Sequence, residues 1–379
     1  MLMKRLTLPK LQPQINPVVI KELRSRMRGG RAFAILTAFL LVLSLVSYGL
    51  YRVVAASMAY NPTGLMSAVI GQVLFAGLAF LELLLVLFIT PALTAGTISG
   101  ERENLTYEML VATPLKPRTI LWGKLLSALS YVLLLIFAAV PLASLVFIFG
   151  GVAPMDALKA LLMLAVTAVT FGVVGLFFSA LTGRTARATV LSYSVLLLLS
   201  IGTLFLFVTW GIVQNDVPPR AILFLNPFSG MASVLAEATP MGGAFGIGSP
   251  FSALAGDLRA FSGRPGIPSV IRPTWHFTLA LYLALSVTLY LVSTQLVKPI
   301  RRWRIGRLGA AVVIVLLLLF GLGGWALSRP VAGPVEGFGV PTPAPLIAPP
   351  APMIIERAVP IPYPPPPTEV PPTLPVDAP

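Results

Sequence analysis

Residues 100–126, GERENLTYEMLVATPLKPRTILWGKLL, are the stretch that decides how this chain is organised. The stretch carries seven charged side chains, yet long apolar runs flank it on both sides. Because charged groups are costly in hydrocarbon, we expect these residues to lie in water between two membrane spans. The sequence therefore predicts a polar loop, residues 100–119, that joins two spans.

The middle of this loop has the pattern of a short amphipathic helix. Residues 105–112 can form about two helical turns, in which Leu105, Met109 and Ala112 share one face. We expect Pro114 to stop this helix and Pro117 to open the next one, which enters the membrane. A small helix held between two spans is suited to transmit force from a soluble partner.

The longer stretch 98–126, ISGERENLTYEMLVATPLKPRTILWGKLL, resembles the corresponding loop of type-2 ABC transporter permeases. In that family an acidic ERE stretch, a Thr, a Leu-rich turn, a TP dipeptide and a GK pair recur, and the loop forms a coupling helix that docks on a separate ATPase subunit. This chain departs from the family where Asn104 and Leu105 replace the usual Gly before the Thr. The resemblance assigns the ATPase contact to Glu101, Arg102, Glu103, Leu105, Thr106, Met109, Leu110, Thr113 and Pro114.

Composition gives the class of protein independently of any motif. The 379 residues are 56% hydrophobic and only 11% charged, with a mean hydropathy of +0.90, which is typical of a polytopic membrane protein. The chain has no cysteine and one histidine, which excludes disulfides, thiolate metal sites and multi-histidine metal sites. We therefore expect no metal ligands in this chain.

The N-terminal segment, residues 1–31, carries eight Lys and Arg and one acid, Glu22. Asn16 can cap and Pro17 can open a helix with a narrow apolar face. The pattern predicts a helix in the membrane interface, and the segment also resembles the elbow helix of type-2 permeases. Its basic face would meet anionic headgroups through Lys21, Arg24, Arg26 and Arg28. The alternative is a solvated basic segment that obeys the positive-inside rule.

Seven apolar segments follow, each near the roughly 20 residues that a helix needs to cross a bilayer. They predict an all-α membrane protein with spans at about 32–51, 66–94, 120–149, 158–181, 189–212, 275–297 and 308–327. With the N-terminus in the cytoplasm, the cytoplasmic segments hold 19 of the 27 basic residues. We therefore expect a multi-pass protein of the plasma membrane with its C-terminal tail outside. Topology accounts for the basic charge, and no nucleic acid partner is needed.

Glu82 is the single acid within a predicted span. An ionised carboxylate in hydrocarbon costs several kcal/mol, so we expect Glu82 to face the bundle interior, to be paired, or to be protonated. One interpretation is a polar point in a substrate path or a proton-sensitive switch. The other is a structural hydrogen bond to a neighbouring span or to a second chain.

The remaining segments extend the six-span domain, residues 32–297. The outer loop 213–273 contains two apolar helical patterns too short to cross the bilayer, which predict interfacial or re-entrant helices. Its NPF sequence, Asn226 to Phe228, again resembles type-2 permeases, although NP also simply caps helices. Residues 298–328 form a basic turn and a seventh span that the usual six-span permease lacks. The tail, 329–379, holds 18 of the 36 prolines and is expected to be extended or disordered, either as a spacer or as a binding segment.

No phosphate-binding GxxxxGK[ST] loop occurs in the sequence, so we expect ATP and Mg to be bound by the partner and no cofactor by this chain. The resemblance implies the permease subunit of an ABC exporter, which is not itself an enzyme. Because six spans supply half a pathway in that family, it also implies a second permease chain. The alternative is a non-transporting membrane scaffold with a proline-rich binding tail.

Overall fold

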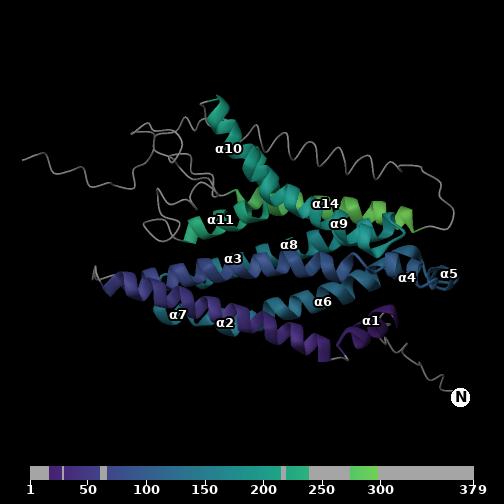
Figure 1. The fold of residues 1–379 in the computed structure, drawn as a ribbon, viewed down its shortest axis with the longest axis horizontal. Coiled ribbons are helices and arrows are strands. Elements are labelled where there is room, and N and C mark those ends of the chain that lie inside the picture. Colours follow the sequence, from purple (N-terminus) through teal and green to yellow (C-terminus); the bar gives the residue numbers. More distant parts are fainter. Residues whose placement is uncertain (1–16, 28–29, 60–65, 215–218, 239–273, 298–379) are drawn as a thin grey trace, which may run out of the picture. The chain divides into compact units, whose positions relative to one another are not determined.

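A computed structural model describes residues 17–27, 30–59, 66–214, 219–238 and 274–297, and every regular element in these ranges is a helix (Figure 1). All of these residues belong to the first of two units of the chain, Met1–Arg329. The elements are α1 (Pro17–Met27), α2 (Gly30–Ala59), α3 (Met66–Thr94), α4 (Ser99–Glu103), α5 (Tyr107–Val111), α6 (Pro117–Ser144), α7 (Val146–Phe149), α8 (Pro154–Leu181), α9 (Thr185–Leu197), the π-helix η1 (Leu198–Gly202), α10 (Thr203–Gln214), the 3-10 helix η2 (Arg220–Leu225), α11 (Pro227–Ala238) and α14 (Trp275–Leu296).

Six helical stretches in the described ranges are long and apolar enough to cross a membrane, which confirms the predicted all-α, six-span architecture. They are Ala32–Ala56, Ser67–Glu103, Pro117–Phe149, Pro154–Leu181, Thr185–Gln214 and Trp275–Leu296. Helices α1 and α6 begin at the prolines that the sequence indicated, Pro17 and Pro117. The predicted seventh span, the second apolar pattern of the outer loop (249–263) and the proline-rich tail lie outside the described residues.

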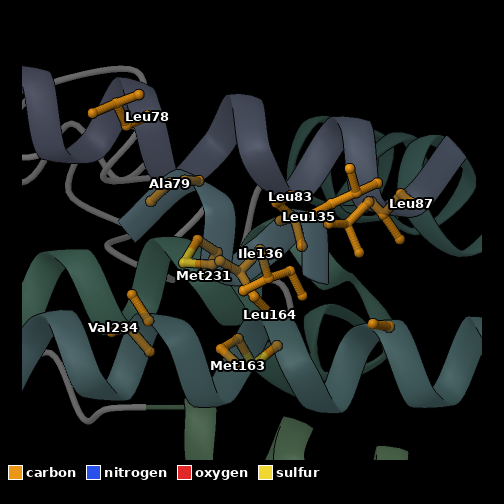
Figure 2. Packing of buried hydrophobic residues seen from close by; sticks show 14 of the residues in the cluster. Leu78, Ala79, Leu83, Leu87, Leu135, Ile136, Met163, Leu164, Met231 and Val234 are labelled. Carbon is orange, nitrogen blue, oxygen red and sulfur yellow. The ribbon is translucent and has the colours of Figure 1, made fainter. Parts of the chain in front are cut away.

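The main core lies where α3, α6, α8 and α11 meet. Figure 2 shows side chains of all four helices converging, with Leu83 and Leu87 of α3 close to Leu135 of α6. Met163 of α8 and Met231 of α11 are fully buried in the same cluster. Helices α3 and α8 are the most buried of the six spans, so they form the centre on which the others pack.

Two glycines let α3 and α8 approach each other closely. A Cβ built on Gly172 would lie 3.3 Å from the methyl group of Thr90, and one on Gly175 would collide with the side chain of Thr94. The Thr94 hydroxyl itself donates to the carbonyl of Thr90 at 3.0 Å. Small residues of this kind bring membrane helices into backbone contact, where dispersion forces hold them.

Helix α11, the first predicted helix of the outer loop, packs inside the bundle. Its residues Met231, Ala232, Val234 and Leu235 are fully buried, and α11 contacts α3, α8 and α14. At 12 residues it spans about 18 Å, which is too short to cross a bilayer. The structure therefore favours the re-entrant alternative over the interfacial one.

Asn226 of the NPF sequence anchors α11 at its start. Its Oδ1 accepts from the backbone N–H groups of Phe228 at 2.8 Å and Ser229 at 3.2 Å, which caps the helix. Its Nδ2 donates to the carbonyl of Ser200, in the π-helix, at 2.7 Å and to the hydroxyl of Thr203 at 3.0 Å. The capping interpretation of NP is thus correct, and the same side chain also joins α11 to the fifth span.

The close approach of α3 and α8 generates a stability prediction. Gly175→Leu should destabilise the protein by about 1–3 kcal/mol or more, because the added side chain must displace Thr94 and the α3 backbone. The matched control is Gly183→Leu, since a Cβ at Gly183 meets nothing within 4 Å. Thermal unfolding of both variants in detergent measures the difference, and equal midpoints would contradict the close packing.

Candidate functional site

The loop between the second and third spans folds as two single-turn helices joined by a tight turn. Helix α4 ends at Glu103, and Leu105 adopts a left-handed conformation with φ 57°. The N–H of Thr106 then donates to the carbonyl of Glu101 at 2.9 Å, and its hydroxyl donates to Oε2 of Glu101 at 2.5 Å. These bonds fold the turn back onto α4.

The turn corrects the predicted helix boundaries. Helix α5 is Tyr107–Val111, so the prediction of a helix from Leu105 to Ala112 is wrong at its start. At its end Ala112 is the C-cap, and its N–H still donates to the carbonyl of Glu108 at 2.9 Å. A left-handed residue cannot lie inside a right-handed helix, which excludes Leu105 from it. The chain also leaves the helix before Pro114, through a turn in which the Thr113 hydroxyl donates to the carbonyl of Leu110 at 2.7 Å.

An exposed apolar tip projects from this loop. Leu105 is 85% exposed and Met109 is 74% exposed, whereas Leu110 is half-buried. Thr106, Thr113 and Pro114 are also exposed. Large apolar side chains that stay exposed on a loop mark a surface for a partner.

A buried ammonium group ties the loop to two other elements. Lys124 of α6 has a side chain only 4% exposed, and its Nζ lies 3.1 Å from Oε1 of Glu22 on α1 and 2.9 Å from Oε1 of Glu101 on α4. We call these three residues the Lys124 cluster. Lys21 of α1 adds a favourable charge interaction with Glu101. Removing one partner of a buried ion pair costs about 3–5 kcal/mol, and the partial exposure of the two carboxylates reduces that figure.

Glu103 joins the loop to the fifth span. Its two carboxylate oxygens accept from the backbone N–H of Thr185 at 3.0 Å and from the Thr185 hydroxyl at 2.6 Å, at the first residue of α9. A carboxylate is favourable at a helix N-terminus, where the backbone donors are unpaired. In addition, the hydroxyl of Ser179 in α8 accepts from the N–H groups of Ile98 and Ser99 at 2.9 and 3.0 Å.

Arg102 and Tyr107 complete the attachment of the loop. The Arg102 guanidinium donates to the carbonyl of Thr182 at 3.2 Å and lies 4.8 Å from the centre of the Tyr107 ring, a cation–π contact. The Tyr107 hydroxyl donates to the carbonyl of Val297, directly after α14, at 2.9 Å. The pair α4–α5 is therefore bonded to α6, the α8–α9 turn, the start of α9 and the end of α14, and Lys124 links it to α1. Figure 1 shows the pair at the same end of the helices as α1.

The structure places the other predicted site residues as follows. Lys21 and Arg24 are exposed on α1, while Glu22 of the same helix faces Lys124. Arg26 lies within α1, and Arg28 lies outside the described residues. Among the residues that the structure describes, no three His, Cys, Asp or Glu side chains are grouped to hold a metal ion.

Glu82 lies inside the bundle, on helix α3. It is only 5% exposed, and its Oε1 has no hydrogen-bond partner among the described residues. The structure thus agrees with the expectation that it faces the interior. The described part of the chain contains no hydrogen bond to Oε1 of Glu82, so it gives no support to a structural hydrogen bond at that atom.

Sequence reasoning did not single out Lys124, Glu22, Thr185 or Ser179. For Lys124 a signal was present, because a lysine followed by a long apolar run must be paired if it is buried. The other three carry no such signal. Helical periodicity separates the apolar face of α1 from its polar residues, and it does not indicate which polar residue turns toward a neighbouring helix.

Comparison with known protein families fits this arrangement. The family model described as ABC-2 family transporter protein matches residues 16–294. The chain belongs to the ABC-2 transporter family. Six apolar spanning helices and this family together make it a multi-pass membrane permease of an ABC transporter. No curated protein sequence matches the chain.

The Oε1 atom of Glu82, which has no hydrogen-bond partner in the described part of the chain, generates a prediction. Replacing a buried polar group that lacks a partner by an apolar one of similar size is neutral or stabilising. Glu82→Leu should therefore unfold at the same temperature as the parent or higher, and Glu82→Gln, which keeps a buried polar group, should gain nothing. Thermal unfolding in detergent measures both, and clear destabilisation by Leu would mean that the carboxyl group is hydrogen-bonded.

Proposed function

We propose that this chain is the permease subunit of an ABC exporter and that α4–α5 docks on a separate ATPase subunit. One observation carries the proposal: two single-turn helices present an exposed apolar tip and are bonded to four different parts of the bundle. A docking element needs both properties, a surface for the partner and firm attachment to the elements that it moves. ATP and Mg would be bound by the ATPase subunit.

The attachments suggest how movement of the loop reaches the spans. ATP binding would close two ATPase subunits and displace α4–α5. The Lys124 cluster would carry this displacement to α1 and α6, Glu103 would carry it to α9, and Tyr107 would carry it to α14. Since the contacts with α9 and α14 lie at helix ends, a small displacement would tilt whole helices and open a central path outward.

A second permease chain completes the proposal. Helices α3 and α8 are mostly buried within one chain, whereas α2 and the α9–α10 span are mostly not. The α9–α10 span leaves Phe205, Leu206 and Trp210 exposed, and lipid or a second chain would cover such an apolar surface. As in other six-span permeases, we propose that two chains form the pathway, either identical or different.

The alternative function is a membrane scaffold that transports nothing. A scaffold with a proline-rich tail has no use for an apolar tip tied to four parts of the bundle, and this observation favours the permease. The two functions differ in whether the loop binds an ATPase subunit, so that binding is the decisive measurement.

The docking prediction concerns Met109. Met109→Asp should abolish copurification with the ATPase subunit, because burying an apolar side chain of this size contributes about 1.5–3 kcal/mol and an unpaired carboxylate opposes burial. Asn104→Asp is the matched control, since it adds the same charge to an exposed position of the same loop without removing apolar surface. Pull-down from solubilised membranes that recovers the ATPase equally with both variants would sink the docking proposal.

The orientation of the chain generates a separate prediction. We propose that the N-terminus and the α4–α5 loop are cytoplasmic and that the tail after the seventh apolar run is outside. In this cysteine-free chain, Thr342→Cys should react with a membrane-impermeant maleimide in intact cells, whereas Thr106→Cys should react only after the cells are opened. The reverse labelling would contradict the orientation, and labelling of both only in opened cells would mean that residues 308–327 do not span.

A further inference from the structure

Helix α1 has two sides with different partners. Glu22 turns toward the bundle and forms the ion pair with Lys124. Arg24 and Ile20 are exposed, with Ile20 43% exposed. A short helix that exposes a basic and an apolar side chain is suited to the surface of an anionic membrane.

A short chain of bonds connects the inward side of α1 to the docking tip. Lys124 Nζ bonds Glu22 at 3.1 Å and Glu101 at 2.9 Å, and the other carboxylate oxygen of Glu101 accepts from Thr106 at 2.5 Å. Thr106 follows Leu105, whose side chain forms part of the apolar tip. One path from α1 to the tip thus runs through the Lys124 ammonium group and the Glu101 carboxylate.

Two carboxylates share this one ammonium, so their positions are linked. Lys124 is nearly excluded from solvent, and a displacement of Glu22 changes the field and the geometry in which Glu101 is held. Any ligand that favours one position of α1 must then favour the matching position of α4. By thermodynamic reciprocity, a partner that docks on the tip alters the affinity of α1 for its own ligand by the same factor.

We propose that α1 is a sensor of anionic lipid, and that the Lys124 cluster transmits its occupancy to the α4–α5 tip. Anionic headgroups under Arg24 hold α1 in the position in which Glu22 bonds Lys124, and this strengthens docking of the ATPase subunit. The inference rests on the proposed function and deepens it, because it names a lipid class that regulates the docking site. Lys21 contributes to the same basic side, and it also interacts with Glu101, so Arg24 is the cleaner probe of the lipid contact.

The test measures the affinity of the permease for the ABC ATPase subunit that copurifies with the wild type. The permease is reconstituted in nanodiscs of phosphatidylcholine alone or of phosphatidylcholine with phosphatidylglycerol. We expect anionic lipid to raise the wild-type affinity about fivefold, the factor that corresponds to one basic side chain beside an anionic surface. Arg24→Gln should lose most of this response, whereas Arg52→Gln, at the opposite end of α2 from α1, should keep it.

Glu22→Gln tests the transmission step. It leaves Arg24 in place and retains an acceptor oxygen for Lys124, but it removes the charge that links α1 to the cluster. The affinity of this variant should no longer depend on lipid charge, and a full fivefold response would overturn the inference. Arg24→Glu is the second variant, for use if Glu22→Gln does not fold. Anionic lipid should lower the affinity of this variant for the ATPase subunit. A response like that of the wild type would overturn the inference.

The outcomes separate this inference from the function on which it rests. Wild-type binding that is measurable in both lipids but insensitive to lipid charge overturns the lipid sensor alone and leaves the docking proposal intact. Absence of binding in either lipid overturns the docking proposal and the sensor together.

Discussion

The buried ammonium group of Lys124 is the constraint on which the arrangement at the α4–α5 end depends. A charge excluded from water is tolerated only where opposite charge and hydrogen bonds replace its hydration. Glu22 and Glu101 supply both, and they come from α1 and α4, which are separated from Lys124 by 102 and 23 residues. The single lysine of α6 thus fixes where the N-terminal helix and the polar loop lie against the third span.

The use of charged side chains for attachment also explains why the loop presents an apolar tip. Helices of five residues do not persist on their own, because nucleating a helix costs more than one turn of hydrogen bonds returns. Three charged side chains of α4, Glu101, Arg102 and Glu103, therefore bond α6, the α8–α9 turn and α9. Several polar groups of the loop are used for attachment, and the large apolar side chains of Leu105 and Met109 are left exposed.

The sequence predicts the spans and several helix starts, but it does not predict which distant residues contact one another. Apolar runs near 20 residues predict spans because a bilayer imposes that length, and Pro17 and Pro117 mark helix starts because proline lacks the donor that a first turn leaves unused. The start of α5 was mispredicted because periodicity does not reveal that Leu105 takes a left-handed turn. The partners of Glu103 and Tyr107 lie 82 and 190 residues away, and no local pattern encodes such distances. The ATPase contact assigned to the loop residues, like the inward and outward sides of the membrane, stays a prediction.

The two ends of the bundle are held by different chemistry, and the difference follows from where water is available. At the α4–α5 end, ion pairs and a carboxylate cap join the helices, and their partly exposed carboxylates retain some hydration. Around α11 the corresponding joints are neutral. Asn226 bonds the π-helix, Tyr282 donates to the carbonyl of Leu225 at 2.8 Å, and the Ser233 hydroxyl caps the start of α14 by accepting from Thr274 at 2.8 Å. Fully buried amides and hydroxyls cost far less to desolvate than ions.

The π-helix provides the bond that fixes the fifth span to the re-entrant helix α11. A π-turn leaves a backbone carbonyl available to a side chain. Asn226 donates to that carbonyl, so the two elements are joined where the hydrogen-bond ladder of the fifth span is irregular. Movement introduced at the α4–α5 end would therefore reach the opposite end of the bundle through the neutral hydrogen bonds around α11.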